Sequence, residues 1–268
     1  MKYPIAKNSF ILPSGASGLD AVREGCVGLT APRHVIRGES PQDNTPSSCH
    51  ESQQESATFI DYIAFSYKGD LSPKERFPLY TVITKLFGIP SSSLIKSKSG
   101  RNGYTHCVVF TGFGYLAYGG SSQKNTIYVV ISGNGCKLIP SWKAVYDWST
   151  KHQVKITRLD IAFDDPSGEL VNVQSAMRWY NLGLFNTGGR PPKRHLRDDF
   201  NDGSGKTFYV GKRGNSKLLR VYEKGKEQGD PKSLWCRAEI EFLAKDQRIS
   251  WDAVINPDPY FSGAYTAL

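Results

Sequence analysis

A stretch of alternating side chains in the last quarter of the chain constrains the fold most strongly. It reads KLLRVYEKGKEQGDPKSLWCRAEIEF, two strand-like runs joined by a polar loop. Because side chains alternate faces along a strand, Arg220, Tyr222 and Lys224 are predicted to share one face of the first run. One face of the second run carries Arg237, Glu239 and Glu241. Such a mixture is costly to bury in a core, so this sheet face is predicted to be a functional site.

Length and composition set wide bounds around this stretch. The chain has 268 residues, of which 39% are hydrophobic and 22% charged, as expected for one large or two small globular domains. The sequence contains no apolar run of about 18 residues, which a membrane span needs, and no continuous secretory signal. Its five cysteines are widely spaced without a CxxC pair, which indicates neither a zinc site nor a disulfide framework. A reducing, cytoplasmic setting without a membrane is therefore expected.

Positive charge is concentrated just before residues 217–242 and in their first part. The net charge is +9, and eleven Lys and Arg residues stand against four Asp and Glu residues between Arg190 and Lys226. Such a run can be a solvated loop, but the aromatic residues among the bases favour binding to nucleic acid. The predicted DNA-binding residues are Lys193, Arg194, Arg197, Lys206, Lys212, Arg213 and Lys217.

An internal duplication is predicted from the order of elements. Both halves read strand, helix, three strands, helix, and IAF recurs at 63–65 and 161–163. SWxAV recurs at 141–145 and 250–254. The predicted fold class is α+β: two pseudo-repeated β-α-β-β-β-α halves form one antiparallel-rich sheet, with helices on one face and an open DNA-binding face on the other.

The predicted domain organisation has three parts. They are a flexible Ser/Pro-rich segment at 1–57, a main domain at 58–255 with halves at 58–152 and 153–255, and a C-terminal extension at 256–268.

A third predicted strand adds carboxylates to the candidate site. In VKITRLDIAFDD, alternation puts Arg158, Asp160 and Asp164 on one face. Asp160, Glu239 and Glu241 supply hard oxygen ligands, which suit Mg²⁺ or Mn²⁺ beside a phosphate. Such an ion would stabilise charge on phosphodiester oxygens during displacement.

Tyr222 is a candidate nucleophile on the same face. A tyrosine has an ordinary pKa of about 10 and must be activated, here by Arg220 and Lys224 or by a metal. A phenol is also a good leaving group, which suits breaking and rejoining of a strand. The alternative is a half-buried packing tyrosine on a solvated face of cross-strand ion pairs. Tyr209 is a rival nucleophile.

The motifs TRLDIAFDD, TFYVGKRGNSKLLRVYEKGKEQ and WCRAEIEF resemble those of the replication initiation factors (Rep) of rolling-circle plasmids and filamentous phages. The resemblance covers about Phe59 to Leu268. It implies a metal-dependent DNA endonuclease and strand transferase whose tyrosine stays on the 5′ phosphate and frees a 3′ hydroxyl that primes replication. Carried over to this chain, the tyrosine is Tyr222, and the carboxylates are Asp160, Glu239 and Glu241.

The resemblance also sets expectations about partners. It implies origin DNA in a bacterial cytoplasm, with a host helicase and polymerase, and a homodimer is a further expectation. The ending NPDPYFSGAYTAL resembles the phage proteins, which continue past it, so a truncated C-terminus is expected.

Two other functions compete with the nicking enzyme. One is a non-catalytic, sequence-specific DNA-binding regulator of replication, and the other is an RNA-binding module on a stacking sheet face. The enzyme requires Tyr222 within reach of the carboxylates, whereas the binding modules do not.

Overall fold

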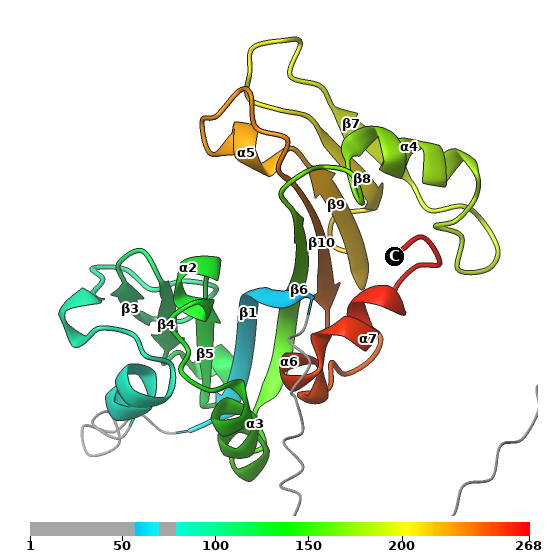
Figure 1. The fold of residues 1–268 in the computed structure, drawn as a ribbon. Coiled ribbons are helices and arrows are strands. Elements are labelled where there is room, and N and C mark those ends of the chain that lie inside the picture. Colours follow the sequence, from blue (N-terminus) through cyan, green and yellow to red (C-terminus); the bar gives the residue numbers. More distant parts are fainter. Residues whose placement is uncertain (1–56, 70–78) are drawn as a thin grey trace, which may run out of the picture. The chain divides into compact units, whose positions relative to one another are not determined.

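The computed structural model describes residues 57–69 and 79–268, so the predicted N-terminal segment lies almost wholly outside the described residues. Within them, ten strands form one sheet in the order β2-β3-β4-β5-β1-β6-β10-β9-β8-β7, with antiparallel neighbours (Figure 1). The first five strands are β1 (Phe59–Lys68), β2 (Leu94–Lys96), β3 (His106–Phe110), β4 (Gly114–Tyr118) and β5 (Thr126–Ile131). The other five are β6 (Lys155–Asp165), β7 (Arg194–Arg197), β8 (Thr207–Gly211), β9 (Lys217–Tyr222) and β10 (Cys236–Leu243). The prediction of a mixed fold with a large antiparallel sheet is confirmed.

The strand count of each half differs from the prediction by one. Each half contributes four strands after its first strand, because β2 and β7 add an outer strand at each edge. The β7 strand lies inside the run predicted as a charged loop, where it pairs with β8 from Arg194 to Arg197. Charged side chains are common on edge strands because they discourage further pairing, and they concealed this strand in the sequence. The internal duplication remains a hypothesis.

The helical segments are short. They are η1 (Val82–Leu86), η2 (Ser91–Ser93), η3 (Ser121–Gln123), α2 (Gly133–Cys136), α3 (Trp142–Lys151), α4 (Val173–Asn181), α5 (Lys224–Glu227), α6 (Asp252–Ile255) and α7 (Pro257–Ser262). Ile83 of η1 and the following Phe87 are buried, and Gly88 comes next with a φ of +67°. The sequence SPKE at 72–75 predicts a capping box between Ser72 and Glu75, and these residues lie outside the described part of the chain. Ser141 caps α3 by accepting a hydrogen bond from the backbone N–H of Ala144.

Aromatic packing forms the core on one side of β1. The Phe65 ring centre lies 5.5 Å from that of Phe87, 6.2 Å from Trp148 and 5.9 Å from Trp251. The Trp251 indole N–H also donates to the carbonyl of Val154, which satisfies the polar atom of a largely buried ring. Burial of these rings holds α3 and α6 against the sheet.

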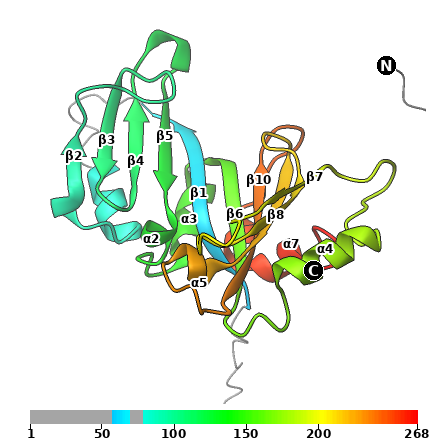
Figure 2. The same ribbon diagram turned by 90° about the horizontal axis from the view of Figure 1, so that it is seen from above.

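The short helices α2 and α5 approach the opposite face of the sheet. Figures 1 and 2 show both on one side of β6 and β10, whereas α4 and α7 lie on the other. Gly133 of α2 sits so close to Asp61 that a Cβ there would lie 2.7 Å from its carboxylate. Lys224 of α5 lies over the ring of Tyr222. The polar face is therefore bordered by two helical turns and is not bare of helices.

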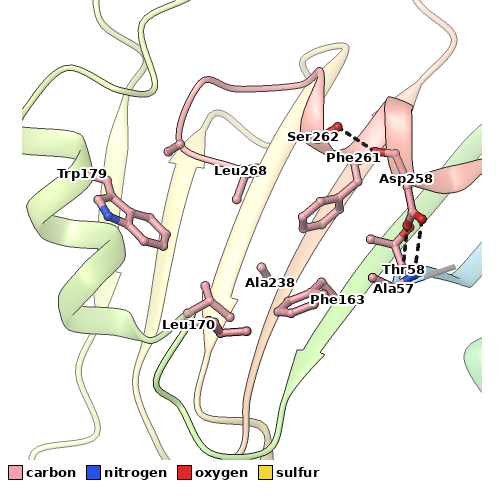
Figure 3. A pocket seen from close by; sticks show the side chains of 12 residues that line it. Ala57, Thr58, Phe163, Leu170, Trp179, Ala238, Asp258, Phe261, Ser262 and Leu268 are labelled. Carbon is pink, nitrogen blue, oxygen red and sulfur yellow. Dashed lines mark hydrogen bonds between the residues drawn. The ribbon is translucent and has the colours of Figure 1, made fainter. Parts of the chain in front are cut away.

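Residues 256–268, predicted as an extension, pack onto the sheet. Phe261 and Tyr265 are buried, and Asp258 accepts hydrogen bonds from the backbone N–H and hydroxyl of Thr58 at 2.9 and 2.6 Å. Phe261 also lines an apolar pocket of about 290 Å³ between α4, α7 and the sheet, with Trp179 opposite (Figure 3). This segment is thus part of the folded unit. Among the described residues, no helix is long and apolar enough to cross a membrane.

The buried carboxylate of Asp165 organises the turn after β6. It accepts five hydrogen bonds, from the backbone and hydroxyl of Ser167 and from the N–H groups of Gly168, Leu170 and Val171, at 2.7–3.1 Å. Burial acts to raise its pKa, but these hydrogen bonds lower the pKa below the ordinary value.

Replacing Asp165 by asparagine is therefore expected to destabilise the fold by about 2 kcal/mol at neutral pH, because the amide NH₂ would face N–H donors. A depressed carboxylate pKa stabilises the fold above the ordinary pKa and ceases to do so as pH falls through the folded value. The difference between wild type and Asp165→Asn in urea unfolding should accordingly be largest near pH 7 and shrink below about pH 4. An unchanged difference at low pH would contradict this role.

Candidate functional site

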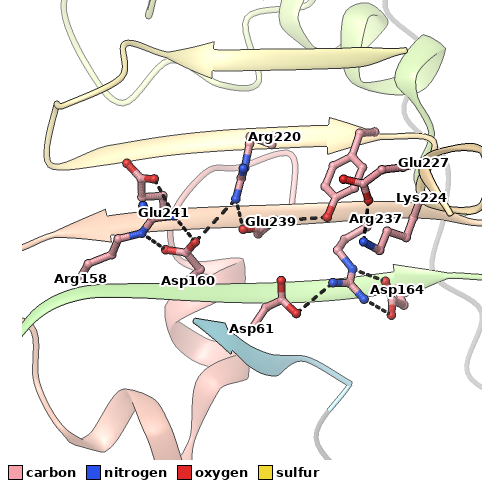
Figure 4. Close-up of polar contacts among 11 residues, drawn as sticks. Asp61, Arg158, Asp160, Asp164, Arg220, Lys224, Glu227, Arg237, Glu239 and Glu241 are labelled. Atoms are coloured by element: carbon pink, nitrogen blue, oxygen red, sulfur yellow. Dashed lines mark hydrogen bonds and ion pairs between the residues drawn. The ribbon is translucent and has the colours of Figure 1, made fainter. Parts of the chain in front are cut away.

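Three adjacent strands bring the predicted site residues onto one sheet face. In the register of β9, β10 and β6, Tyr222 lies opposite Arg237, which lies opposite Asp164. Two residues along, Arg220 lies opposite Glu239, and the next row pairs Glu241 with Asp160. Since cross-strand partners share a face, the alternation predicted from the sequence is correct for these strands (Figure 4).

The three carboxylates predicted to bind a metal are paired with arginines in this structure. Arg158 donates to both oxygens of Asp160 at 2.8 and 2.5 Å and lies 3.0 Å from Glu241. Arg220 donates to Glu239 and lies 3.6 Å from Asp160. Asp160 and Glu239 are only 1% and 3% exposed, so these charges are held in a largely dehydrated cluster. Buried ion pairs of this kind are retained at a cost in solvation free energy and therefore point to a function.

A second arginine cluster adjoins the first. Arg237 donates to both oxygens of Asp164 at 2.6 and 2.8 Å and to Asp61 at 3.0 Å. Asp61 reaches this face because the β1–β6 register shifts between Ile60 and Tyr62, which is a β-bulge. Strict alternation would have put Asp61 on the core face with Ile63. The sequence therefore carried no signal for the place of Asp61, whereas the same alternation puts Tyr62 on the polar face, opposite Asp160.

The Tyr222 hydroxyl lies within the carboxylate cluster. It donates to Glu239 Oε2 at 3.1 Å, and the residue is 9% exposed. The enzyme hypothesis requires the Tyr222 hydroxyl to lie on the same sheet face as Asp160 and Glu239, and it does. Within the described part of the chain, the Tyr209 hydroxyl has no such hydrogen bond to a carboxylate. The ring centre of Tyr209 lies 5.9 Å from that of His195.

The predicted activation of Tyr222 by neighbouring cations is not what the structure shows. Burial raises the pKa of Tyr222 well above its ordinary value, the Glu239 charge raises it further, and Arg237 opposes them. Lys224 begins α5 instead of continuing the strand, and its ammonium group pairs with Glu227 at 2.5 Å, 5.6 Å from the ring centre of Tyr222. A nucleophilic role for Tyr222 would therefore require a base that accepts the phenol proton, and Glu239 Oε2 is within hydrogen-bond distance of the hydroxyl.

The donor set partly fits a divalent ion. Asp160 and Glu239 are hard oxygen ligands on adjacent strands, and burial raises the pKa of both. However, no group of three or more His, Cys, Asp or Glu side chains among the described residues is arranged to hold a metal. The chemistry of these carboxylates therefore suits Mg²⁺ or Mn²⁺, but some of their oxygens would have to leave the arginines in order to bind the ion.

A basic hollow of about 420 Å³ lies at the β7–β9 end of the sheet. It is lined by Lys193, Arg194, His195, Arg197, Tyr209, Gly211, Lys212, Arg213 and Leu218. Tyr209 and His195 are cross-strand partners in the row that leads to Arg220 and Glu239. Five of the seven predicted DNA-binding residues thus gather beside the carboxylate cluster.

Three of those seven residues have other partners. Lys217 lies on the face opposite the carboxylate cluster. There it donates to the carbonyl of Ala264, and its ammonium group is 3.9 Å from the ring centre of Tyr265. Alternation explains this, because Lys217 shares its face with buried Leu219. Arg194, although it lines the hollow, donates to Asn181 of α4 at 2.8 Å, and Lys206 pairs with Asp198 at 3.2 Å. The assignment of Lys217 to DNA binding does not fit this geometry.

Replacing Lys217 by methionine should accordingly leave DNA affinity and its salt dependence unchanged and lower the free energy of unfolding by about 1 kcal/mol at most. Arg213→Gln, in the hollow, is the matched comparison and should reduce the slope of log K against log salt by about one. Fluorescence anisotropy with a labelled oligonucleotide measures both. An equal loss of slope in Lys217→Met would restore that residue to the DNA surface.

Comparison with known proteins supports the resemblance read from the motifs. A model of the replication initiation factor family matches residues 154–268, the part that carries Tyr222 and the three carboxylates. The structure is also similar to that of a rolling circle replication initiator protein from Geobacillus stearothermophilus, with a TM-score of 0.56 and 25% sequence identity over 69% of this chain and 74% of that one. No curated protein matches the chain. Residues 154–268 are thus similar to the replication initiation factor family, as the resemblance of the motifs predicted.

Proposed function

We propose that this protein initiates rolling-circle replication by nicking and rejoining one DNA strand through Tyr222. The observation that carries the proposal is the hydrogen bond from the Tyr222 hydroxyl to Glu239, inside a buried cluster of carboxylates and arginines. The family match over residues 154–268 and the similar initiator structure support replication initiation as the process.

Each step of the reaction has a candidate group. Tyr222 Oη attacks the scissile phosphorus while Glu239 accepts the phenol proton, and the bond between phosphorus and the 3′ oxygen breaks. The 3′ oxygen takes a proton from water and leaves as a hydroxyl, and the 5′ phosphate stays on Tyr222. In the reverse step a 3′ hydroxyl gives its proton to water as its oxygen attacks the phosphorus, the bond between phosphorus and Tyr222 Oη breaks, and Glu239 returns its proton to the phenol.

The arginines of the cluster would hold the phosphate. The Arg220 Nε atom is buried and has no hydrogen-bond partner in the described part of the chain, so it offers a donor that the fold does not use. Arg237 is the cation that lowers the pKa of Tyr222 and would stabilise the phenolate as it forms. Bound next to Asp160, Glu239 and Glu241, Mg²⁺ or Mn²⁺ would neutralise charge on the non-bridging phosphate oxygens.

A supercoiled plasmid that carries the cognate origin tests the proposal. With Mg²⁺ or Mn²⁺ present, the protein should convert it to relaxed or nicked circles and become covalently attached to the 5′ side of the break. Chelation with EDTA should stop the reaction without preventing binding. Salt-sensitive binding with no nicking under either metal would favour the non-catalytic DNA-binding regulator instead.

A further inference from the structure

The polar face continues past the nicking site into the first half of the sheet, where tyrosines replace the charges. Tyr62 on β1, Tyr115 on β4 and Tyr128 on β5 are all half-buried, and Tyr104 lies in the loop before β3. Together with Arg101 of that loop, they are called the tyrosine tract here. Nothing in the nicking chemistry uses these residues.

Contacts within the tyrosine tract join its members into one surface. The rings of Tyr104 and Tyr128 stack with centres 6.2 Å apart at 16°, and the rings of Tyr115 and Tyr128 lie 6.3 Å apart. Tyr62 and Tyr128 share this face by register, because Ser66 of β1 pairs with Tyr128 and lies four residues along the strand from Tyr62. The Arg101 guanidinium lies 4.9 Å from the ring centre of Tyr115.

Small side chains form the floor of this face between the tyrosines. Ala64, Ala117 and Val130 share this face by register, since Ala64 pairs with Val130, Val130 with Tyr115, and Ala117 with Tyr128. Both alanines are 0% exposed and Val130 is 3% exposed. Small residues on the polar side of a sheet become buried when larger side chains close over them. The tyrosine side chains above this floor are only half-buried, so part of their surface is exposed to solvent.

Tyr62 connects the tract to the nicking site. The Arg158 guanidinium lies 4.4 Å from the ring centre of Tyr62, and the same guanidinium binds Asp160 and Glu241. Tyr62 is also the β1 partner of Asp160. A strand whose phosphate lies at Tyr222 can therefore pass its neighbouring nucleotides along one continuous face onto the tract.

We propose that the tyrosine tract binds unpaired nucleotides next to the scissile phosphate by base stacking. Aromatic rings and arginine planes are the usual platforms for single-stranded DNA, because every base has a π face and only unpaired bases expose it. Arg101 adds a positive charge for the backbone, and Arg158 sits at the junction with the site. The inference rests on the proposed function for the identity of the strand, whereas its binding test does not depend on nicking.

Binding of a labelled single-stranded oligonucleotide, measured by anisotropy, tests this proposal. Tyr128→Leu and Tyr115→Leu should each weaken binding about tenfold, whereas Tyr128→Phe should bind like wild type. The slope of log K against log salt should stay unchanged in the Leu variants and fall by about one in Arg101→Gln, because only the latter removes a charge. Tyr146→Leu, on α3, is a control that should have no effect.

Other results would overturn the proposal. Leu variants that remain folded by circular dichroism and bind single-stranded DNA like wild type would exclude the tract. So would an equal loss in binding of a fully paired duplex, or tighter binding of an RNA of the same sequence. Because Arg101 is exposed and lies in a loop, Arg101→Gln provides a readout even if a Leu variant misfolds. Wild type that binds through the tract but never nicks would contradict the proposed function alone.

Discussion

Tyr222→Phe should abolish covalent attachment to origin DNA and lower the nicking rate at least about a thousandfold, because it removes the only atom that can form the phosphotyrosyl bond at this position. The Tyr222→Phe variant keeps the ring that packs beside Lys224, and it loses one hydrogen bond to Glu239. DNA affinity and thermal stability should therefore change little. An oligonucleotide labelled on the 3′ side of the nick, resolved on a denaturing protein gel, measures the adduct directly.

Tyr209→Phe is the matched control for this experiment. Tyr209 lies one strand away on the same face, two residues along in register, and lines the basic hollow. Its loss should reduce binding at most and leave attachment intact once DNA saturates the protein. Undiminished adduct in Tyr222→Phe together with its loss in Tyr209→Phe would move the nucleophile to Tyr209.

Glu239→Gln should lower both nicking and rejoining by at least about a hundredfold. Glutamine still accepts a hydrogen bond from the Tyr222 hydroxyl, but it takes up no proton at neutral pH and removes the charge that faces Arg220. Single-turnover rates with a suicide oligonucleotide measure the nicking step, and transfer to a second strand measures rejoining.

Glu227→Gln controls for the general loss of a carboxylate near Tyr222. Glu227 is largely exposed and pairs with Lys224 outside the cluster, so this variant should nick at close to the wild-type rate. A manganese titration separates two roles of Glu239: recovery at high Mn²⁺ would indicate a metal ligand, and no recovery would indicate the base. A wild-type rate in Glu239→Gln at low metal would exclude both roles.

The strands that carry the site could be predicted because their alternation is regular. On β6, β9 and β10, buried Ile161, Leu219 and Ile240 alternate with polar residues, so the faces of Asp160, Arg220 and Glu239 followed from the pattern alone. The same rule correctly applied would also have removed Lys217 from the DNA surface, since it shares its face with Leu219.

Features that depend on a break in regularity could not be predicted. The bulge at Asp61 adds one residue to β1 and leaves no mark in composition or period. The path of Lys224 depends on the start of α5 immediately after Tyr222, where alternation ceases to apply. The pKa of Tyr222 depends on how deeply the ring is buried, which the neighbouring charges in the sequence do not reveal.

The adjacency of β1 and β6 has a consequence for where this protein can be divided. Sequence similarity to the family begins at residue 154, just before β6, yet β6 pairs with β1 along most of its length. A fragment cut at that point would turn a central strand into an unprotected edge and would leave Arg237 facing Asp164 without Asp61. The boundary of the family match therefore falls between two paired strands of one sheet, and Asp61, which lies outside the match, pairs with Arg237 inside it.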